Sequence, residues 1–194
     1  MEKLTREDLY SLEQYSKVRN EFRSRVIEHK KPRRVSLGPN LNVYFEDRLT
    51  MQYQVQEMLR IERIFEAEAI DEELDTYNPL IPDGNNLKAT MMIEYDDIDA
   101  RRVALGRLIG IEGRIWIKVE GFDKVYAIAD EDLGRSNDSK TSAVHFLRFE
   151  LGVEASAAAR AGAAINIGVD HDEYRYAVEP VDEVTRASLA ADLG

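Results

Sequence analysis

Apolar and polar positions at the start of the chain follow the period of a helix. Between residues 5 and 31 the apolar positions recur at helical spacing and lie at Leu9, Leu12, Val18, Phe22 and Val26. Thr5 and Asp8 have the spacing of a capping box. Pro32 ends the pattern, because proline lacks the N–H that a helix interior needs. We therefore predict a helix over residues 5–31.

The pattern then changes to the two-residue period of a strand. Residues 35–46 contain two apolar runs around Gly38-Pro39-Asn40, which is a typical turn sequence. In the second run Leu41, Val43 and Phe45 alternate with Asn42, Tyr44 and Glu46. This alternation predicts a hairpin with one buried face and one face in contact with water.

A second helical pattern runs from about residue 48 to residue 74. Its apolar positions form one stripe and lie at Met51, Val55, Met58, Ile61 and Phe65. The end of the segment, residues 66–75, carries six acidic residues and no basic one. We predict a long helix here whose last turns present an acidic, solvated face.

The rest of the chain mixes hairpins with helices. We predict strands at 89–95, 143–151 and 174–178, a hairpin over 113–130, and helices at 97–109, at 154–164 and from Pro180 onward. Such a mixture is typical of an α+β fold with a largely antiparallel sheet packed against several helices. The sequence shows no repeat and no linker, so we predict one domain over residues 1–194, with helix 5–31 as its docking arm.

Composition and charge narrow the classes of function. The chain has 194 residues, of which 44% are hydrophobic and 32% charged, as in a soluble globular protein. No apolar run approaches the roughly 20 residues that span a bilayer, and the N-terminus does not resemble a secretory signal. We expect no membrane insertion and a cytoplasmic location. A net charge of −11 makes nucleic acid an unexpected partner.

The absence of cysteine excludes a thiolate nucleophile, cysteine-ligated metal and an iron–sulfur cluster bound by this chain alone. A divalent metal would therefore need histidine and carboxylate ligands, for which His145, His171 and Asp170 are the candidates. The Glu-x-x-His pairs of ferritin-like di-iron proteins do not occur, because Val26, Ser142 and Gly168 stand three residues before the histidines.

The two candidate histidines have simple structural interpretations as well as functional ones. His145 shares a strand face with Leu147 and Phe149, which favours a hydrogen-bonded core histidine over a metal ligand. His171 lies between Asp170 and Asp172 at the end of a strand, which favours a solvated turn. If the two imidazoles meet at one rim of the sheet, they would form a site for Zn, Mn or Fe(II), or an acid–base site.

Charged side chains on the helices supply further candidates. Glu57 and Glu62 are the carboxylates that an acid–base enzyme could use together with the histidines, although surface ion pairs are the commoner outcome. Candidate ligand-binding cations are Arg19, Arg23, Arg60, Arg63 and Arg148. Residues 1–34 carry ten Lys and Arg against six acidic residues. An alternative function is therefore anion or nucleotide binding through Arg19, Arg23, Lys30 and Arg33 of this basic segment.

Several phrases also point to a family. "RIERIFE", "NPLIPDGNNLKATMMIEY", "VHFLRFEL" and "GVDHDEY" occur in order along nearly the whole chain. In these phrases the sequence resembles the bacterial domain-of-unknown-function family DUF3501. The resemblance implies a genomic context beside rubrerythrin and an iron–sulfur oxidoreductase, and it carries no catalytic residue. It favours an accessory protein of a redox or oxidative-stress system that binds a partner protein or a small ligand. The oligomeric state is left open, and a homo-oligomer is one of the alternatives.

Overall fold

The computed structural model describes residues 1–132, 134–137 and 139–194. The described residues form an α+β fold in which every strand pair is antiparallel, as predicted. The helices are η1 (Arg6–Asp8), α1 (Leu12–Lys30), η2 (Lys31–Arg33), α2 (Arg48–Glu62), α3 (Ala67–Tyr77), η3 (Asn78–Leu80), α4 (Ile98–Arg107), η4 (Ile111–Arg114), α5 (Gly152–Arg160) and α6 (Glu183–Ala190). Among these described elements, no helix combines the length and the apolar character that crossing a membrane requires.

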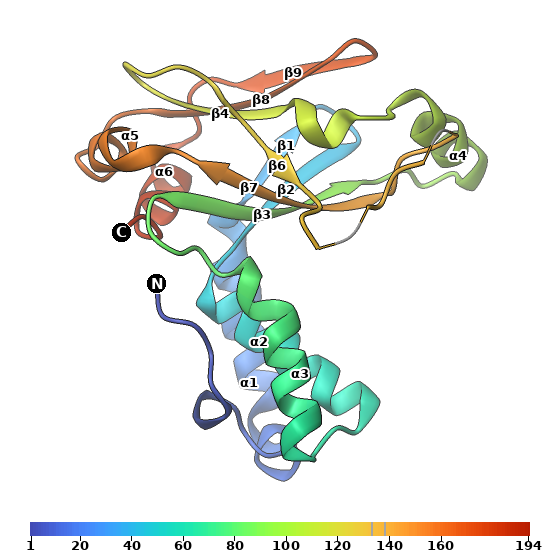
Figure 1. Cartoon of the computed structure of the whole chain (residues 1–194), viewed down its shortest axis with the longest axis vertical. Helices are drawn as coiled ribbons and strands as arrows, with labels where there is room; N and C mark the ends of the chain where they lie inside the picture. The colour runs from blue at the N-terminus through green and yellow to red at the C-terminus, as the bar shows by residue number, and fades with distance from the viewer. Residues whose placement is uncertain (133, 138) are drawn as a thin grey trace.

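The described strands form two sheets that face each other across the main core. Sheet A has the order β1-β2-β3-β7-β6 and sheet B the order β5-β4-β8-β9. The strands are β1 (Arg34–Leu37), β2 (Leu41–Glu46), β3 (Asn86–Ile93), β4 (Ile115–Val119), β5 (Val125–Tyr126), β6 (Ile128–Ala129), β7 (Val144–Glu150), β8 (Ile165–His171) and β9 (Tyr174–Val178). Aliphatic side chains of both sheets share one buried cluster with α5 and α6. Figure 1 shows sheet B above sheet A in this view, with α5 and α6 at one end and α4 at the other.

The two sheets are joined along both sides. On one side the chain runs from β5 of sheet B directly into β6 of sheet A, and only Ala127 lies between them. On the other side the Tyr174 hydroxyl donates to the Leu37 carbonyl oxygen and so connects β9 to β1. Gly38, with a φ of 73°, makes this contact possible, since a Cβ there would lie 2.6 Å from the Tyr176 ring.

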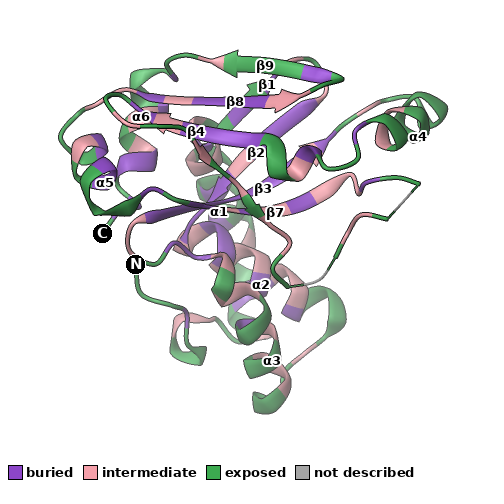
Figure 2. Cartoon of the chain, turned by 45° about the horizontal axis from the view of Figure 1, so that its top comes forward, coloured by how far each residue is buried: buried purple, intermediate pink, exposed green. Residues whose placement is uncertain are grey.

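A separate layer of helices, α1, α2 and α3, projects below sheet A (Figure 1). We refer to it as the helical lobe, and to the two sheets with α4, α5 and α6 as the β lobe. Tyr15, Phe22 and Val26 of α1 form one small core against α2, and Met51, Val55 and Leu59 of α2 belong to another. Figure 2 shows the most continuous burial along the sheets, with exposed residues concentrated on the outer surfaces of the helices and on β9.

The N-terminal helix begins later than the sequence pattern predicted. Thr5 and Asp8 do form a capping box, but it caps only η1. Helix α1 starts at Leu12 behind a second capping box, in which the Ser11 side chain accepts from the Gln14 N–H. The apolar pattern alone could not separate the two elements, because Leu9 and Leu12 keep the helical spacing across the break.

The predicted long helix over 48–74 is two helices. Helix α2 ends at Glu62, and Arg63 follows in the left-handed region with a φ of 56°. The chain then re-enters a helix, α3, at Ala67. The predicted stripe was wrong at its end, since Ile61 and Phe65 are 56% and 74% exposed while Leu59 is buried.

Two smaller predictions also need correction. The polar face of β2 is not in contact with water, because Asn42 and Glu46 are buried as well. Asn42 meets Arg34 and Ser36, and Glu46 accepts from Thr90. The last helix, predicted to open at Pro180, begins at Glu183, where the Asp182 side chain caps it by accepting from the Thr185 N–H. A capping carboxylate therefore determines the start, as is usual for helices.

Candidate functional site

The side chain of His145 lies in a polar pocket inside the β lobe. It is fully buried, on the same face of β7 as Leu147 and Phe149, as the strand period predicted. Its Nδ1 lies 2.6 Å from Oδ2 of Asp130. Its Nε2 lies 2.8 Å from Oγ1 of Thr141 and 3.1 Å from the carbonyl oxygen of Ser142. Each ring nitrogen therefore has oxygen neighbours, and His145 is a hydrogen-bonded core residue.

Glu112 completes this pocket on the Nε2 side. Its Oε1 accepts from the Ser136 hydroxyl at 2.8 Å, and its Oε2 lies 3.2 Å from Thr141 Oγ1 and 3.9 Å from His145 Nε2. Ser136 and Thr141 also contact each other through their hydroxyl groups at 2.9 Å. We call Glu112, Asp130, Ser136, Thr141 and His145, with the Ser142 carbonyl, the His145 network.

Four segments of the chain bring the network together. Strand β6 pairs with β7, so Asp130, the residue after β6, lies beside Phe146: its N–H donates to the Phe146 carbonyl oxygen, and its Oδ1 accepts from the Phe146 N–H. Glu112 comes from η4, directly before β4. The Thr141 N–H donates to the Leu105 carbonyl oxygen at the end of α4. Asp130 has a φ of 52°, which a side-chain-bearing residue rarely adopts and which is common at functional sites.

Arg135 fixes Asp130 from outside. Its Nη1 donates to Asp130 Oδ1 at 3.2 Å, and its guanidinium group lies 4.5 Å from the centre of the Phe146 ring. Asp132 accepts from both terminal nitrogens of the same arginine. Oδ1 of Asp130 thus has a cationic donor and the Phe146 N–H, which leaves Oδ2 for the imidazole.

Three members of the network could hold a metal ion. They are Glu112, Asp130 and His145, and one ligand atom from each lies within 4.8 Å of the other two. Among the residues that the structure describes, this is the group of histidine and carboxylate side chains that lies so close together. His171 and Asp170, which the sequence suggested as further ligands, are not members.

His171 has a different environment at the end of β8. Its Nε2 lies 3.1 Å from the Ile109 carbonyl oxygen, and its Nδ1 accepts from the Glu173 N–H at 3.2 Å. Asp170 points away and accepts from Lys124 and from the Tyr126 hydroxyl, each at 2.9 Å. Burial would raise the pKa of Asp170, but these two donors hold it below its usual value.

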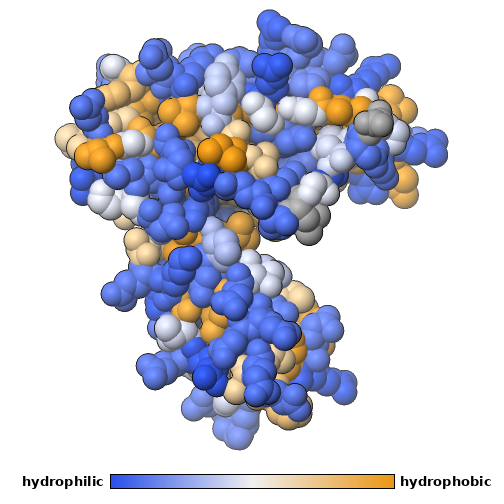
Figure 3. Space-filling model, viewed as in Figure 1, coloured by the Kyte–Doolittle hydropathy of each residue, from blue (hydrophilic) through white to orange (hydrophobic). Residues whose placement is uncertain are grey.

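A cleft of about 580 Å³ separates the end of the helical lobe from sheet A beside the network. Tyr77 and Leu80 line it on one side, and Ile128 and Phe146 on the other. The hollow between the two lobes is visible at the right of the view in Figure 3. Sequence reasoning named one of its charged residues, Arg148.

Arg148 is held at this cleft by carboxylates. Its Nε and Nη2 each donate to Glu131 at 2.7 Å, and its Nη1 donates to Glu150. The hydrogen bonds that Arg148 donates to Glu131 raise the pKa of Arg148, although burial opposes this. The guanidinium group is therefore permanently charged and fixed in position.

The helix carboxylates that the sequence suggested, Glu57 and Glu62, do not contact His145 or His171. Glu57 is held by Tyr15, Arg19 and Arg60, with Arg19 donating through Nε at 2.7 Å and through Nη2 at 2.9 Å. The hydrogen bond from Arg19, against the effect of burial, lowers the pKa of Glu57 to about 2. The remaining candidates of this group are exposed on the helical lobe, namely Glu62, Arg63 and Arg23.

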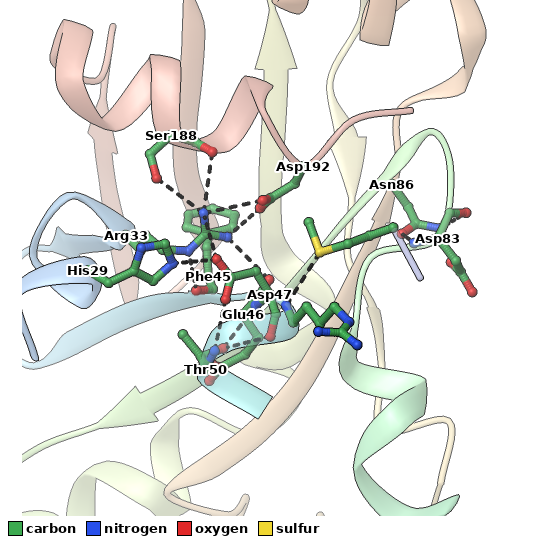
Figure 4. Close-up of polar contacts among 12 residues, drawn as sticks. His29, Arg33, Phe45, Glu46, Asp47, Thr50, Asp83, Asn86, Ser188 and Asp192 are labelled. Carbon is green, nitrogen blue, oxygen red and sulfur yellow. Dashed lines mark hydrogen bonds and ion pairs between the residues drawn. The ribbon is translucent and has the colours of Figure 1, made fainter. Parts of the chain in front are cut away.

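Arg33, proposed above as part of an anion site, is instead the centre of a buried network at the junction of the lobes. Only 2% of it is exposed, and its Nε donates to the Phe45 carbonyl oxygen. Its terminal nitrogens donate to Ser188, to the Glu46 carbonyl oxygen and to Asp192. Figure 4 shows these acceptors around the guanidinium group. Lys30, the other cation proposed from this segment, is partly exposed at the end of α1.

Two buried carboxylates share this one arginine. Asp47 lies 3.4 Å from Arg33 and also contacts His29 Nε2 at 2.5 Å. Burial would raise its pKa, but the charge of Arg33, the Thr50 N–H and His29 lower it. At Asp192 burial, together with the charge of Asp47, raises the pKa to about 6 in spite of Arg33 and His29. We call Arg33, Asp47, Asp192 and His29 the Arg33 network.

The sequence identified His145 but not its partners. Glu112, Asp130 and Thr141 lie in a short η turn, at the end of a two-residue strand and in a loop, and none of them belongs to a short motif. The pairing of β6 with β7 brings them together, and this pairing is a long-range property. The loop's Ser and Thr content was the available signal, and it is also common in ordinary loops.

Comparison with known proteins gives a family and a close structural relative. A protein family described as "Protein of unknown function (DUF3501)" matches residues 3–193. A crystal structure of a novel protein of unknown function from Burkholderia pseudomallei K96243 is 53% identical, covers 100% of both chains and has a TM-score of 0.94. No curated protein matches the chain.

Proposed function

This chain belongs to the DUF3501 family of proteins of unknown function, so we propose a role from its own residues. We propose that it is a cytoplasmic accessory protein of a redox or oxidative-stress system, and that it binds a small ligand in the cleft between its lobes. The redox part of the proposal rests on the genomic context that the resemblance implies. The binding part rests on the cleft.

The cleft itself is the observation that carries the proposal. Its volume of about 580 Å³ lies within the roughly 300–1,000 Å³ that is typical of small-molecule sites. Apolar side chains of both lobes line it, and charged groups of Arg148 and Arg135 stand at its edge. A largely apolar wall with a few fixed polar groups is the usual composition of a ligand site.

The charged edge indicates the kind of ligand. Three N–H groups of Arg148 donate to Glu131 and Glu150, and each terminal nitrogen of a guanidinium carries a second N–H. Those second N–H groups have no acceptor within the part of the chain that the structure describes. A ligand with an apolar body and an oxygen acceptor, either carbonyl or carboxylate, would satisfy one of them while its body packs on Phe146.

The binding proposal can be tested with a fluorescent probe of this chemistry, anilinonaphthalene sulfonate. We expect the folded protein to bind it with increased fluorescence, and Ile128→Glu to weaken binding at least tenfold, because a negative charge in the cleft repels the sulfonate. Ile128 is 43% exposed, so the substitution leaves the core intact. Val153→Glu, on α5 at 70% exposure, is the matched control and should bind as the wild type does. Equal binding by the wild type and Ile128→Glu would exclude the cleft.

The redox role needs a separate test. The full-length protein, immobilised through an N-terminal tag, should retain rubrerythrin or the iron–sulfur oxidoreductase from a native lysate of its own organism. The Ile128→Glu variant distinguishes a partner that reaches the cleft from one that binds elsewhere. Recovery of neither protein by the wild type would count against the redox role and leave the ligand-binding role to stand on the probe measurement.

A further inference from the structure

The Nδ1 side of His145 has one well-defined proton. Oδ1 of Asp130 already accepts from Arg135 and from the Phe146 N–H. Its Oδ2 lies 2.6 Å from Nδ1, and a carboxylate oxygen can only accept in such a contact. The ring proton on Nδ1 therefore points at Asp130, and Nε2 of the neutral ring is left with a lone pair that faces the other side of the pocket.

The Nε2 side has more acceptors than protons. Nε2 lies 3.1 Å from the Ser142 carbonyl oxygen, and two lone pairs meet there when the ring is neutral. The single Thr141 hydroxyl proton can go to Nε2 at 2.8 Å or to Glu112 Oε2 at 3.2 Å, but not to both. In either arrangement the Nε2–Ser142 contact and one of the two contacts of Thr141 Oγ1 are left as pairs of acceptors. A positive group among these four atoms would satisfy them.

A metal ion supplies that positive group, and the spacing of the atoms suits one. The contacts among Nε2, Thr141 Oγ1, the Ser142 oxygen and Glu112 Oε2 measure between 2.8 and 3.9 Å. Atoms that share an ion at roughly 2.0–2.2 Å have neighbour separations of this order. On the far side of the ring, Asp130 occupies the place of the carboxylate that orients a metal-binding histidine through its other nitrogen.

We propose that Glu112, Thr141, Ser142 and His145 form a binding site for one divalent metal ion, with Asp130 as the residue that positions the imidazole. A set with one imidazole and otherwise carboxylate, hydroxyl and carbonyl oxygens suits Mn²⁺ or Fe²⁺. The side chain of Glu112 is 16% exposed, whereas that of His145 is fully buried. The site does not depend on the proposed ligand cleft, and it differs from the His145, His171 and Asp170 set that the sequence suggested.

The direct test is a Mn²⁺ titration of the full chain without a histidine tag, after treatment with a chelator. We expect one bound Mn²⁺ per chain by electron paramagnetic resonance, with a thermal unfolding temperature that rises with Mn²⁺ concentration as binding to the folded state requires. Glu112→Gln keeps the size of the side chain and its acceptor for Ser136 but removes the ligand charge, and it should weaken binding at least tenfold. Asp172→Asn, at an exposed carboxylate beside His171, should change nothing.

Histidine variants separate this site from the alternative at the end of β8. His171→Asn should bind Mn²⁺ as the wild type does, while Asp130→Asn should weaken binding roughly tenfold through loss of the orienting partner. If Asp130→Asn does not fold, Glu112→Gln still decides. The proposal is overturned if the wild type takes up no stoichiometric Mn²⁺, if Glu112→Gln binds it equally well, or if His171→Asn loses it. Ile128→Glu should retain Mn²⁺, so a failure of the cleft proposal would not be mistaken for a failure of this one.

Discussion

The Arg33 network and the His145 network are both buried among carboxylates, but the central group differs. Arg33 is a guanidinium that stays charged under all ordinary conditions, and each of its nitrogens has an acceptor. His145 is an imidazole, whose charge changes readily, and its pocket holds more acceptors than the neutral ring can serve. The first network is complete, whereas the second has a place for one more cation.

The difference teaches what each network is suited to do. A saturated buried arginine joins several chain segments, here η2, β2 and α6, and fixes the junction of the two lobes. A histidine whose Nε2 lone pair faces further oxygen acceptors suits the binding of a metal ion. The following predictions probe this contrast between a structural and an exchangeable network, in order of decreasing effect.

The largest effect should come from the centre of the Arg33 network. Arg33→Met leaves Asp47 and Asp192 buried without their cation, which typically costs about 3–5 kcal/mol in the free energy of unfolding. Urea unfolding measures this loss. Arg23→Met, at an exposed arginine of the same segment, should stay within about 0.5 kcal/mol of the wild type. A loss below about 1 kcal/mol for Arg33→Met would show that the junction does not depend on this charge.

The second prediction concerns the pH dependence of the same network. Asp192 has a folded pKa of about 6 against an ordinary value of 3.8, so the folded state binds its proton more tightly than the unfolded state does. Stability due to Asp192 is therefore highest below about pH 4 and is lost as the pH rises to about 6 and above. Asp192→Asn removes this loss.

The measurement is the difference in unfolding free energy between Asp192→Asn and the wild type as a function of pH. It should shift by roughly 2–3 kcal/mol in favour of the variant between pH 4 and pH 7, since one pKa unit corresponds to about 1.4 kcal/mol. A difference that is constant across this range would mean that Arg33 keeps Asp192 ionised in the folded state at acidic pH.

A smaller effect is expected in the His145 network in the absence of metal. Thr141→Val keeps the shape of a side chain that is 1% exposed but removes its hydroxyl group, so a buried acceptor is left unsatisfied. Such a loss costs about 1–3 kcal/mol by urea unfolding. Thr76→Val is the matched control, because its exposed hydroxyl donates to the Glu72 carbonyl oxygen of its own helix. Equal stability of the two variants would mark Thr141 as dispensable to the pocket.

The smallest effect should come from the partly exposed network around Glu57, which serves as a reference for the two buried networks. Its pKa of about 2 lies below the ordinary 4.5, so its contribution is present above about pH 4.5 and is lost as the pH falls toward 2. Because Arg19 is 30% exposed, Glu57→Gln should cost only about 1 kcal/mol at pH 7. Glu62→Gln, at an exposed carboxylate, should show neither the loss nor its pH dependence.

Most of the strand architecture could be predicted from the sequence, because alternation and turn residues act locally. The hairpin around Gly38 and the strand that carries His145 were confirmed. Helix boundaries were less accessible, since Arg63 adopts the left-handed conformation that residues other than glycine rarely adopt, and the apolar spacing continues across the break. The burial of Asn42 and Glu46 depends on side chains from other strands, which local alternation cannot reveal.

The candidate site was only partly predictable for a related reason. A buried histidine on an apolar strand face is visible in the sequence, and its need for hydrogen-bond partners follows from chemistry. The residues that provide these partners depend on how β6 pairs with β7. Strand β6 has two residues, which is too short for a period of alternating polarity to be recognised in the sequence. At Arg33 the prediction was wrong in the opposite direction. The basic segment suggested a cation on the surface, but Arg33 is buried in the structure.

The direct passage of the chain from β5 to β6 has a mechanical consequence. Ala127 is the single residue between a strand bonded to β4 and a strand bonded to β7, so the two sheets cannot slide past each other while both pairings persist. Asp130 and His145 both belong to sheet A through the pairing of β6 with β7, whereas Glu112 directly precedes β4 of sheet B, so sliding of the sheets would separate Glu112 from the imidazole. A metal ion bound between Glu112 of η4 and His145 of β7 would therefore link the two sheets and resist their sliding, which is the motion that would release the ion.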